Sequence, residues 1–353
     1  MFMKAKLLPV VGITCGDPNG IGIEIILKSF LDKQILEFFV PVVFSNYQLL
    51  CEQAAFFNIE LKFNKIKYGA KPKRGEINVV NAWENKFITE FGKPTKSSGE
   101  NSYKSLELAT KSVIEDNVEV MVTAPINKKN IQNEKFDFPG HTDYLSAKFN
   151  AESLMFMISE KLKIGLLTDH LSINKVVSEI NNEKIKKKIS LMEKSLKIDF
   201  GITRPKIATL SINPHVGDDG VIGNEDQEIL IPTLIEIAKS GTLVSGPYSS
   251  DSFFGSGLYK NYDSVLAIYH DQGLIPFKTL SFGEGINFTA GLDKVRTSPD
   301  HGTAFDIAGK NIADPTSFKN AIFSAIDIYN NRIAYKKGIQ TSFLETKKKR
   351  INK

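Results

Sequence analysis

Short apolar runs alternate with helical patterns along the chain, and this alternation constrains the fold more than any other feature of the sequence. The apolar runs lie at residues 7–14, 39–45, 118–124, 162–168, 206–212, 242–246 and 264–269. They lack a clean period of two, which is typical of strands in a parallel sheet that helices cover on both faces. Helical patterns lie between them, at residues 23–32, 102–116, 184–196, 225–241 and 316–335. We therefore predict an α/β fold with a mostly parallel sheet, and irregular structure with some strand over residues 60–100.

Length and composition bound the class of protein. A chain of 353 residues is long enough for two lobes, each with its own core. The 45 Lys and Arg residues barely exceed the 40 Asp and Glu residues, so nucleic acid is not an expected partner. Cys15 and Cys51 are the two cysteines, which excludes a disulfide framework, and no apolar run approaches the roughly 20 residues that cross a bilayer. We expect a cytoplasmic enzyme with no membrane partner, whose N-terminal stretch forms a strand rather than a signal peptide.

Three of the five histidines follow an apolar run within a few residues. IGLLTDH ends at His170, ATLSINPH at His215 and SVLAIYH at His270. Ligands of open α/β sheets bind outside the carboxyl ends of the strands, and three imidazoles with one open position are typical of a catalytic zinc site. Asp271 or Asp251 could hydrogen-bond the second ring nitrogen of such a ligand. The alternative is that each histidine caps a strand and each acid lies in a solvated turn.

Two glycine-rich segments are candidates for anion binding. CGDPNGIGIEIILKSF follows the first strand candidate, and Asn19 or Asp17 could cap a helix whose first amides hold an anion. A tight turn without a ligand is the alternative, because the third glycine of the dinucleotide fingerprint is missing. Residues 282–315 carry Asn287, Arg296, Asp300, His301, Thr303 and Asp306 within a Gly- and Ala-rich frame. With Lys278 nearby, we interpret this stretch as a ligand-lining loop rather than a set of surface salt bridges.

Taken together, these motifs resemble those of the 4-hydroxythreonine-4-phosphate dehydrogenase family. The matching segments are GITCGDPNGIGIEI, VTAPINK, FPGHTDYL, LLTDHLSI, SINPHVGDDGVIGNED, GPYSSDSFF, YHDQGLIPFK and INFTAGLDKVRTSPDHGTAFDIAG. They run from residue 12 to about residue 315. The resemblance implies two α/β/α lobes like those of isopropylmalate dehydrogenase, with the active site in a cleft between them. We expect one lobe at 1–140 plus 280–353, with the NAD-binding loop, and a metal, substrate and dimerisation lobe at 141–279.

The resemblance also implies site residues, one position at a time. His170, His215 and His270 fall on the family's metal ligands, with zinc as the first choice and magnesium or cobalt as alternatives. The implied substrate-binding residues are His141, Thr142, Lys278, Asn287 and Arg296. HGTAFDIAGKNIADP looks like the adenosine-binding loop of isopropylmalate and isocitrate dehydrogenases, so the implied NAD- or NADP-binding residues are Gly302, Thr303, Ala304 and Asp306. The family is a homodimer whose active site lies at the subunit interface. Departures from its pattern fall in the first loop, at Cys15, Asp17 and Asn19.

The implied activity is NAD-dependent oxidation of 4-(phosphooxy)-L-threonine to 2-amino-3-oxo-4-(phosphooxy)butanoate. This product decarboxylates to 3-amino-2-oxopropyl phosphate, on the route to pyridoxal phosphate (vitamin B6). Lys278, Asp251 and His141 are the candidates for the proton acceptor. Two alternatives stay open. One is a paralogous dehydrogenase for another phosphorylated hydroxy acid or a cyclic dihydrodiol, and the other is a non-catalytic scaffold that binds a metal.

Overall fold

The chain forms two compact units in the computed structural model, which describes residues 8–351 and the side chains of residues 8–339. The first unit comprises Met1–Glu152 and Gly283–Ile326, and the second comprises Ser153–Phe282 and Asp327–Lys353. These borders differ from the predicted 140/141 and 279/280. The helix at 141–149 stays with the first unit because Tyr144 and Leu145 are fully buried in its core. Residues after 326 join the second unit, where Arg332 Nε donates to Asp199 Oδ1.

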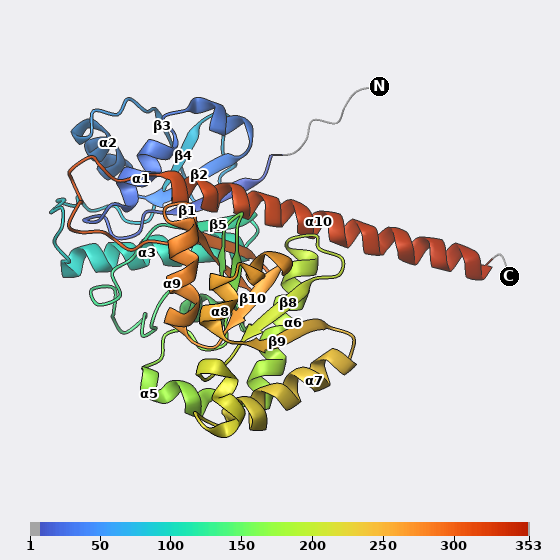
Figure 1. The fold of residues 1–353 in the computed structure, drawn as a ribbon. Coiled ribbons are helices and arrows are strands. Elements are labelled where there is room, and N and C mark those ends of the chain that lie inside the picture. Colours follow the sequence, from blue (N-terminus) through green and yellow to red (C-terminus); the bar gives the residue numbers. More distant parts are fainter. Residues whose placement is uncertain (1–7, 352–353) are drawn as a thin grey trace. The chain divides into compact units, whose positions relative to one another are not determined.

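The first unit is built on a mostly parallel sheet with the strand order β3-β4-β2-β1-β5-β12-β11. Only the β11–β12 hairpin is antiparallel among these described pairs. The strands are β1 Val10–Thr14, β2 Val40–Ser45, β3 Phe63–Ile66, β4 Ile77–Asn81, β5 Val120–Thr123, β11 Ile286–Ala290 and β12 Val295–Pro299. The helices are α1 Gly22–Ser29, a 3-10 turn Lys33–Glu37, α2 Tyr47–Phe56, α3 Lys96–Ile114 and α4 His141–Phe149. Helix α3 packs against β1, β2 and β5 (Figure 1).

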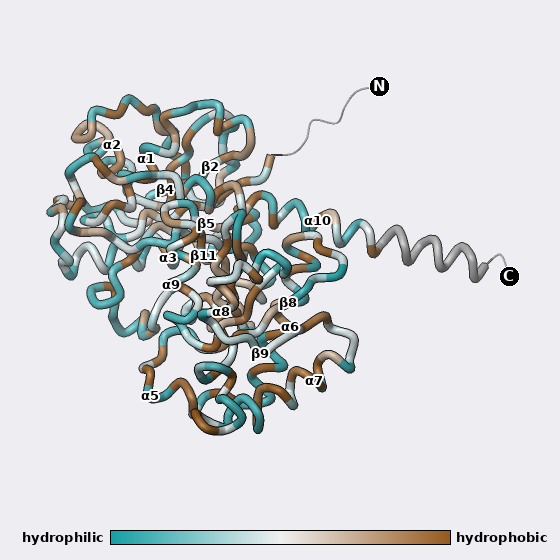
Figure 2. The backbone as a smooth tube through the Cα atoms, viewed as in Figure 1, coloured by the Kyte–Doolittle hydropathy of each residue, from teal (hydrophilic) through white to brown (hydrophobic). Residues whose placement is uncertain are grey.

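The second unit has its own strands in the order β6-β7-β10-β8-β9, again parallel except for the β6–β7 pair. The strands are β6 Leu154–Ile158, β7 Lys163–Leu166, β8 Lys206–Leu210, β9 Leu243–Tyr248 and β10 Ser264–Ala267. Its longer helices are α6 Asn182–Ile198, α7 Ile231–Lys239, α9 His270–Ser281 and the latter part of α10 Thr316–Ile351. Shorter helical segments are α5 Ile173–Val176, Val177–Glu179, Pro214–Gly220, Asp226–Leu230, α8 Ser250–Gly255 and Leu258–Asn261. Figure 2 shows both apolar and polar residues along α7, which packs against β9 and buries Leu234 and Ile237.

The predicted α/β class and mostly parallel sheet are confirmed, and each of the seven apolar runs overlaps a strand. Two other expectations are wrong. Residues 282–315 are not one loop, because they contain the β11–β12 hairpin. Neither Asp17 nor Asn19 caps α1: Ile21 occupies the N-cap position, and the Asp17 carboxylate accepts hydrogen bonds from the Asn19 amide and the Asn130 side chain. Over the part of the chain that the structure describes, no helix is both long and apolar enough to cross a membrane.

Candidate functional site

Two of the three strand-end histidines lie side by side in the second unit. His170 follows β7 and His270 begins α9 directly after β10, and these two strands are parallel neighbours. Their ring centroids are 5.9 Å apart. Rings that share one ion at Zn–N distances of about 2.0–2.1 Å have centroids roughly 5 Å apart, so the pair fits a common ligand with a small movement. Asp271 Oδ1 lies 2.7 Å from His270 Nδ1, so of the two acids considered, Asp271 is the one that contacts His270, and Nε2 is left for another partner.

The third histidine, His215, lies after β8 on an unusual backbone. Residues 215–219 all have positive φ angles, between 45° and 82°. The His215 side chain lies close enough to Asp251 for their charges to interact. Hydrogen bonds from Ser249 and Ser252 lower the pKa of Asp251, and the His215 charge lowers it slightly further. Within the described residues, no three His, Cys, Asp or Glu side chains form a cluster that could hold a metal ion. The structure therefore brings His170 and His270 together and does not add His215 to the pair.

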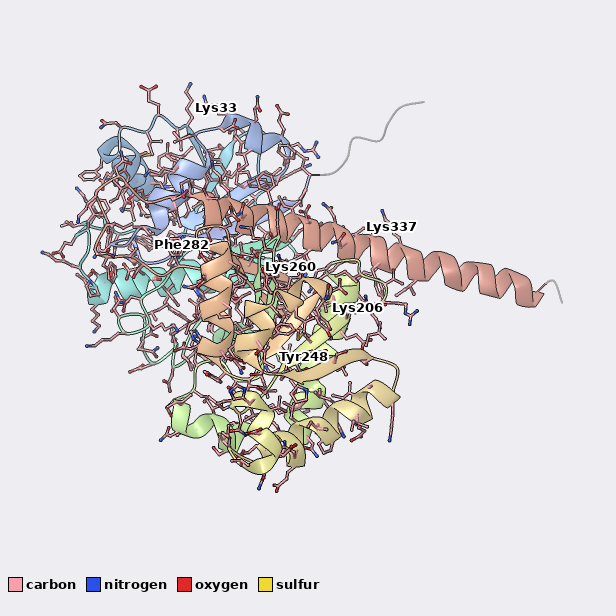
Figure 3. All side chains as sticks on the ribbon, viewed as in Figure 1. Lys33, Lys206, Tyr248, Lys260, Phe282 and Lys337 are labelled. Atoms are coloured by element: carbon pink, nitrogen blue, oxygen red, sulfur yellow. The ribbon has the colours of Figure 1, made fainter. Side chains whose placement is uncertain are left out.

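A cavity of about 870 Å³ opens in the second unit beside these residues. Asp251 and Asp271 line it, and so do Pro214, which precedes His215, and Lys260, which Figure 3 labels. The side chain of Gln272 forms hydrogen bonds to three residues in or beside the wall of this cavity. The Oε1 atom of Gln272 accepts the Ile268 amide at 2.6 Å, and its Nε2 atom donates to Ser211 O and Ser250 Oγ, both at 2.8 Å. The ends of β8 and β10 and the start of α8 are thus tied to one side chain. Lys278 is exposed in the last turn of α9.

The first unit contains a buried cation with neutral partners. Arg296 lies within β12 and is only 2% exposed. Its Nε and Nη2 atoms donate to Thr123 Oγ1 at 3.1 and 2.6 Å, and its Nη1 atom donates to Thr289 Oγ1 at 3.1 Å. Burial lowers the pKa of Arg296 to about 9. A charge held away from water without a carboxylate partner is costly, which favours a site that receives an anion.

His141 lies close to this cation at the start of α4. Burial holds the pKa of His141 well below its usual range, and the positive charges of Arg296 and then Lys128 lower it further. Among the described side chains, no hydrogen-bond partner reaches the buried Nε2 atom of His141 or the buried Oδ1 atom of Asn287. Asn287 lies on the same face of β11 as Thr289, because they are two residues apart in the strand. His141, Asn287 and Arg296 are therefore grouped around polar atoms that a ligand could satisfy.

Lys128 belongs to this cluster and is absent from the predicted site. It follows the carboxyl end of β5, the same kind of position that singled out the histidines, but its chemistry alone is common on protein surfaces. Thr142, the other predicted residue of this segment, is 7% exposed. The turn that carries Lys128 is closely packed, because a Cβ atom on Gly99 of α3 would lie 1.9 Å from Asn130 O.

The predicted cofactor residues lie after β12, where the chain docks on α1. Thr303 O accepts the Ile21 amide at 3.0 Å, and Ala304 has a positive φ of 42°. Further along, Lys28 Nζ donates to the carbonyls of Asn311 and Ala313 at 3.0 and 2.9 Å. Lys28 also pairs with the buried Glu24 of α1, whose Oε1 atom accepts the Ala313 amide. The Thr303 contact also occupies the Ile21 amide, which belongs to the first loop where an anion was expected to bind. Gly302 has open space around its Cα, and Asp306 is exposed.

The fold and these clusters define an α/β protein with a buried arginine among neutral partners in the first unit and a pair of strand-end histidines in the second. The chain belongs to the family described as pyridoxal phosphate biosynthetic protein PdxA, whose model matches residues 37–325. It is 42% identical over 324 residues to a 4-hydroxythreonine-4-phosphate dehydrogenase of Bacteroides thetaiotaomicron, which covers 91% of this chain and 89% of that protein. A solved 4-hydroxythreonine-4-phosphate dehydrogenase of Klebsiella pneumoniae is 31% identical, with a TM-score of 0.78, over 92% of this chain and 99% of that one.

Other relatives carry different names. A protein of Oceanobacillus iheyensis, provisionally named D-threonate 4-phosphate dehydrogenase, is 35% identical over 91% of this chain and 98% of its own length. A terephthalate 1,2-cis-dihydrodiol dehydrogenase structure from Burkholderia xenovorans has a TM-score of 0.60 at 23% identity, covering 90% of this chain and 98% of that one. At that level of identity the likeness concerns the fold alone. The same architecture therefore serves relatives named for different substrates.

Proposed function

We propose that this chain is a 4-hydroxythreonine-4-phosphate dehydrogenase that oxidises the secondary alcohol of 4-(phosphooxy)-L-threonine. The product, 2-amino-3-oxo-4-(phosphooxy)butanoate, is a 3-oxo acid and loses CO2 to give 3-amino-2-oxopropyl phosphate, a precursor of pyridoxal phosphate. One observation carries the proposal beyond family membership: the buried Arg296, with neutral partners, lies beside the unpartnered ring nitrogen of His141. A substrate with both a phosphate and a carboxylate meets the need of such a site for negative charge.

The substrate-binding roles follow from these contacts. Arg296 would bind one anionic group of the substrate through its guanidinium fork, while Thr123 and Thr289 keep the fork in place. His141, Thr142 and Asn287 would hydrogen-bond the polar groups of the substrate, and Lys278 would add a point charge. His141 is neutral at physiological pH because its pKa is low, so it can accept as well as donate.

The proton acceptor for the alcohol is one of Lys278, Asp251 and His141. Hydrogen bonds from Ser249 and then Ser252 lower the pKa of Asp251, which makes it a weak base. His141 has an unpartnered nitrogen beside Arg296, in the cluster that we assign to the substrate. We therefore favour His141 or Lys278.

The redox partner that we propose is NAD or NADP, held by Gly302, Thr303, Ala304 and Asp306. The open space at Gly302 and the docking of this segment on α1 support a preformed nucleotide loop. Bound nicotinamide would supply the hydride acceptor, and the residues of this chain would supply orientation.

We also propose a divalent metal at His170, His215 and His270, with zinc as the best match to imidazole ligands and cobalt or magnesium as alternatives. The proximity of His170 and His270 and the orientation of His270 by Asp271 support this assignment. Such an ion would polarise the substrate hydroxyl.

A homodimer with the active site at its interface is part of the proposal. Large apolar side chains are exposed just after two of the proposed ligands. Ile173 is 71% exposed after His170, and Val221 is 83% exposed after His215. Apolar side chains so close to a site are suited to cover by a second subunit.

A second candidate is D-threonate 4-phosphate dehydrogenase, which the named relative from Oceanobacillus iheyensis favours. Its substrate has a hydroxyl where 4-(phosphooxy)-L-threonine has an amino group. NADH formation by the purified protein with each substrate separates the two candidates, with Co²⁺ or Zn²⁺ supplied. A higher kcat/KM for 4-(phosphooxy)-L-threonine supports the first proposal. NADH formation with neither substrate, in a folded protein that binds both NAD and metal, would overturn both.

A further inference from the structure

Two positive charges act on the ring of His141 in the first unit. After burial, which has the largest effect, the charges of Arg296 and then Lys128 lower the pKa of His141. Arg296 has a role in the proposed function, and Lys128 has none. Lys128 differs from the nearly buried Arg296 because it lies in an exposed turn, where most lysines contact only water. The geometry of this turn decides whether the lysine faces the site or the solvent.

The backbone of Lys128 is tied to the segment that leads into α4. Gln132 Nε2 donates to Lys128 O at 3.0 Å and to Phe138 O at 2.9 Å, so one side-chain amide joins the two ends of this loop. Beyond Phe138, a Cβ atom on Gly140 would lie 3.9 Å from Lys128 Cε. Gly140 is the N-cap of α4 and directly precedes His141. The end of the lysine side chain therefore lies next to the backbone that leads into His141.

A buried carboxylate holds the other side of the turn. Asn130 Nδ2 donates to Asp17 Oδ2 at 2.7 Å and to Ser98 Oγ at 3.0 Å. Asp17 is fully buried, at 0% exposure, and its Oδ1 atom accepts the Asn19 amide at 3.0 Å. Buried hydrogen bonds are stronger than exposed ones, because the local dielectric constant is low. The turn that carries Lys128 is thus attached to the interior of the first unit, although the lysine itself is exposed.

The charge of a phosphorylated substrate calls for a second cation at this site. A phosphate monoester carries about −1.5 to −2 charges at pH 7, which a single guanidinium does not balance. Arg296 also uses its Nε, Nη1 and Nη2 atoms for hydrogen bonds to Thr123 and Thr289, so only its remaining N–H groups can reach a ligand. An ammonium group has three donors that rotate freely, and it binds phosphate oxygens as a point charge. Lys128 can therefore supply the positive charge that Arg296 alone lacks.

We propose that Lys128 binds the phosphate group of the substrate together with Arg296. This inference rests on the proposed function, because it takes the cluster at His141 as the substrate site. It adds one cation, from the loop between β5 and α4, to the proposed substrate-binding residues. The Nε2 atom of His141, which has no partner among the described residues, then remains for another polar group of the substrate.

The test compares Lys128→Met with Lys129→Met in the full-length protein. Lys129 is the matched control, because it is the next residue of the same turn and is also exposed, while the charges that act on His141 are those of Arg296 and Lys128. Two quantities are measured: KM for 4-(phosphooxy)-L-threonine, and Kd of inorganic phosphate by calorimetry. We expect Lys128→Met to raise both by about tenfold with kcat within about twofold of wild type, and Lys129→Met to change neither. Lys128→Arg keeps the charge and should stay within about threefold of wild type.

An equal rise in both methionine variants would overturn the inference, because the effect would then come from surface charge in general. A rise in KM without a rise in the Kd of phosphate would also overturn it, since Lys128 would then act on another group of the substrate. Unchanged values in Lys128→Met, or no phosphate binding by the wild-type protein, would have the same consequence. Failure of the proposed function looks different: the wild-type protein would form no NADH, whereas phosphate binding would still depend on Lys128.

Discussion

Replacing Arg296 by methionine is expected to stabilise the protein and to weaken its affinity for anionic substrate. Burial lowers the pKa of Arg296 from 12.5 to about 9, which at about 1.36 kcal/mol per pH unit corresponds to a cost on the order of 5 kcal/mol. Hydrogen bonds to Thr123 and Thr289 offset roughly 3 kcal/mol of it. The net cost is about 2 kcal/mol, and a well-packed apolar side chain of similar length avoids it.

Urea denaturation and calorimetry measure the first effect. We expect Arg296→Met to raise the free energy of unfolding by about 1–2 kcal/mol and Tm by several degrees, at roughly 2–4 °C per kcal/mol. Steady-state kinetics measure the second effect, and KM for the phosphorylated substrate should rise by about 100-fold. Lys294→Met is the control, because Lys294 precedes β12 and pairs with Asp116 at the surface. A variant that is less stable than wild type by 2 kcal/mol, or that keeps the wild-type KM, would refute the electrostatic reasoning.

The remaining predictions concern the histidines and the cofactor loop. His170→Ala and His270→Ala should each lower metal content after dialysis by at least about tenfold and abolish turnover, whereas His301→Ala should retain its metal; full metal content in either variant would contradict the assignment. Because the pKa of His141 is lower in the folded than in the unfolded state, stability should be full above about pH 6.5 and fall below it. His141→Gln should flatten that acid limb in urea titrations. Lys28→Met should raise KM for NAD several-fold and lower Tm, because Glu24 loses its partner; an unchanged KM for NAD would count against the loop assignment.

Most strands that the sequence predicts are buried apolar runs, but the match is incomplete: β6, which is apolar and buried throughout, was missed, and β9, which is only partly buried, was predicted. β2 and β10, for example, are fully buried on both faces, so their apolar runs are continuous. The two strands of the β11–β12 hairpin were not predicted, because the buried residues Thr289, Arg296 and Thr297 interrupt the apolar pattern. The polar residues that interrupt the apolar pattern of these two strands include Arg296, which we propose binds the substrate.

Part of the candidate site could also be predicted from the sequence. The ends of parallel strands placed His170 and His270 correctly beside each other, since neighbouring strands of known direction end at one edge. The left-handed turn that begins at His215 was not predictable, because positive φ angles at non-glycine residues contradict local propensity. The proximity of Lys128 to His141 depends on the path of the loop between β5 and α4, which composition and spacing do not encode.

The anchoring of residues 303–313 on α1 has a thermodynamic consequence. Thr303 and Ala313 are already bonded to the helix through Ile21, Glu24 and Lys28. Binding of a dinucleotide to this segment would therefore cost the protein little conformational entropy, because the backbone of the segment is already ordered before the dinucleotide binds. The side chains of residues 303–313 would then determine the selectivity between NAD and NADP, because the backbone of this segment would change little on binding.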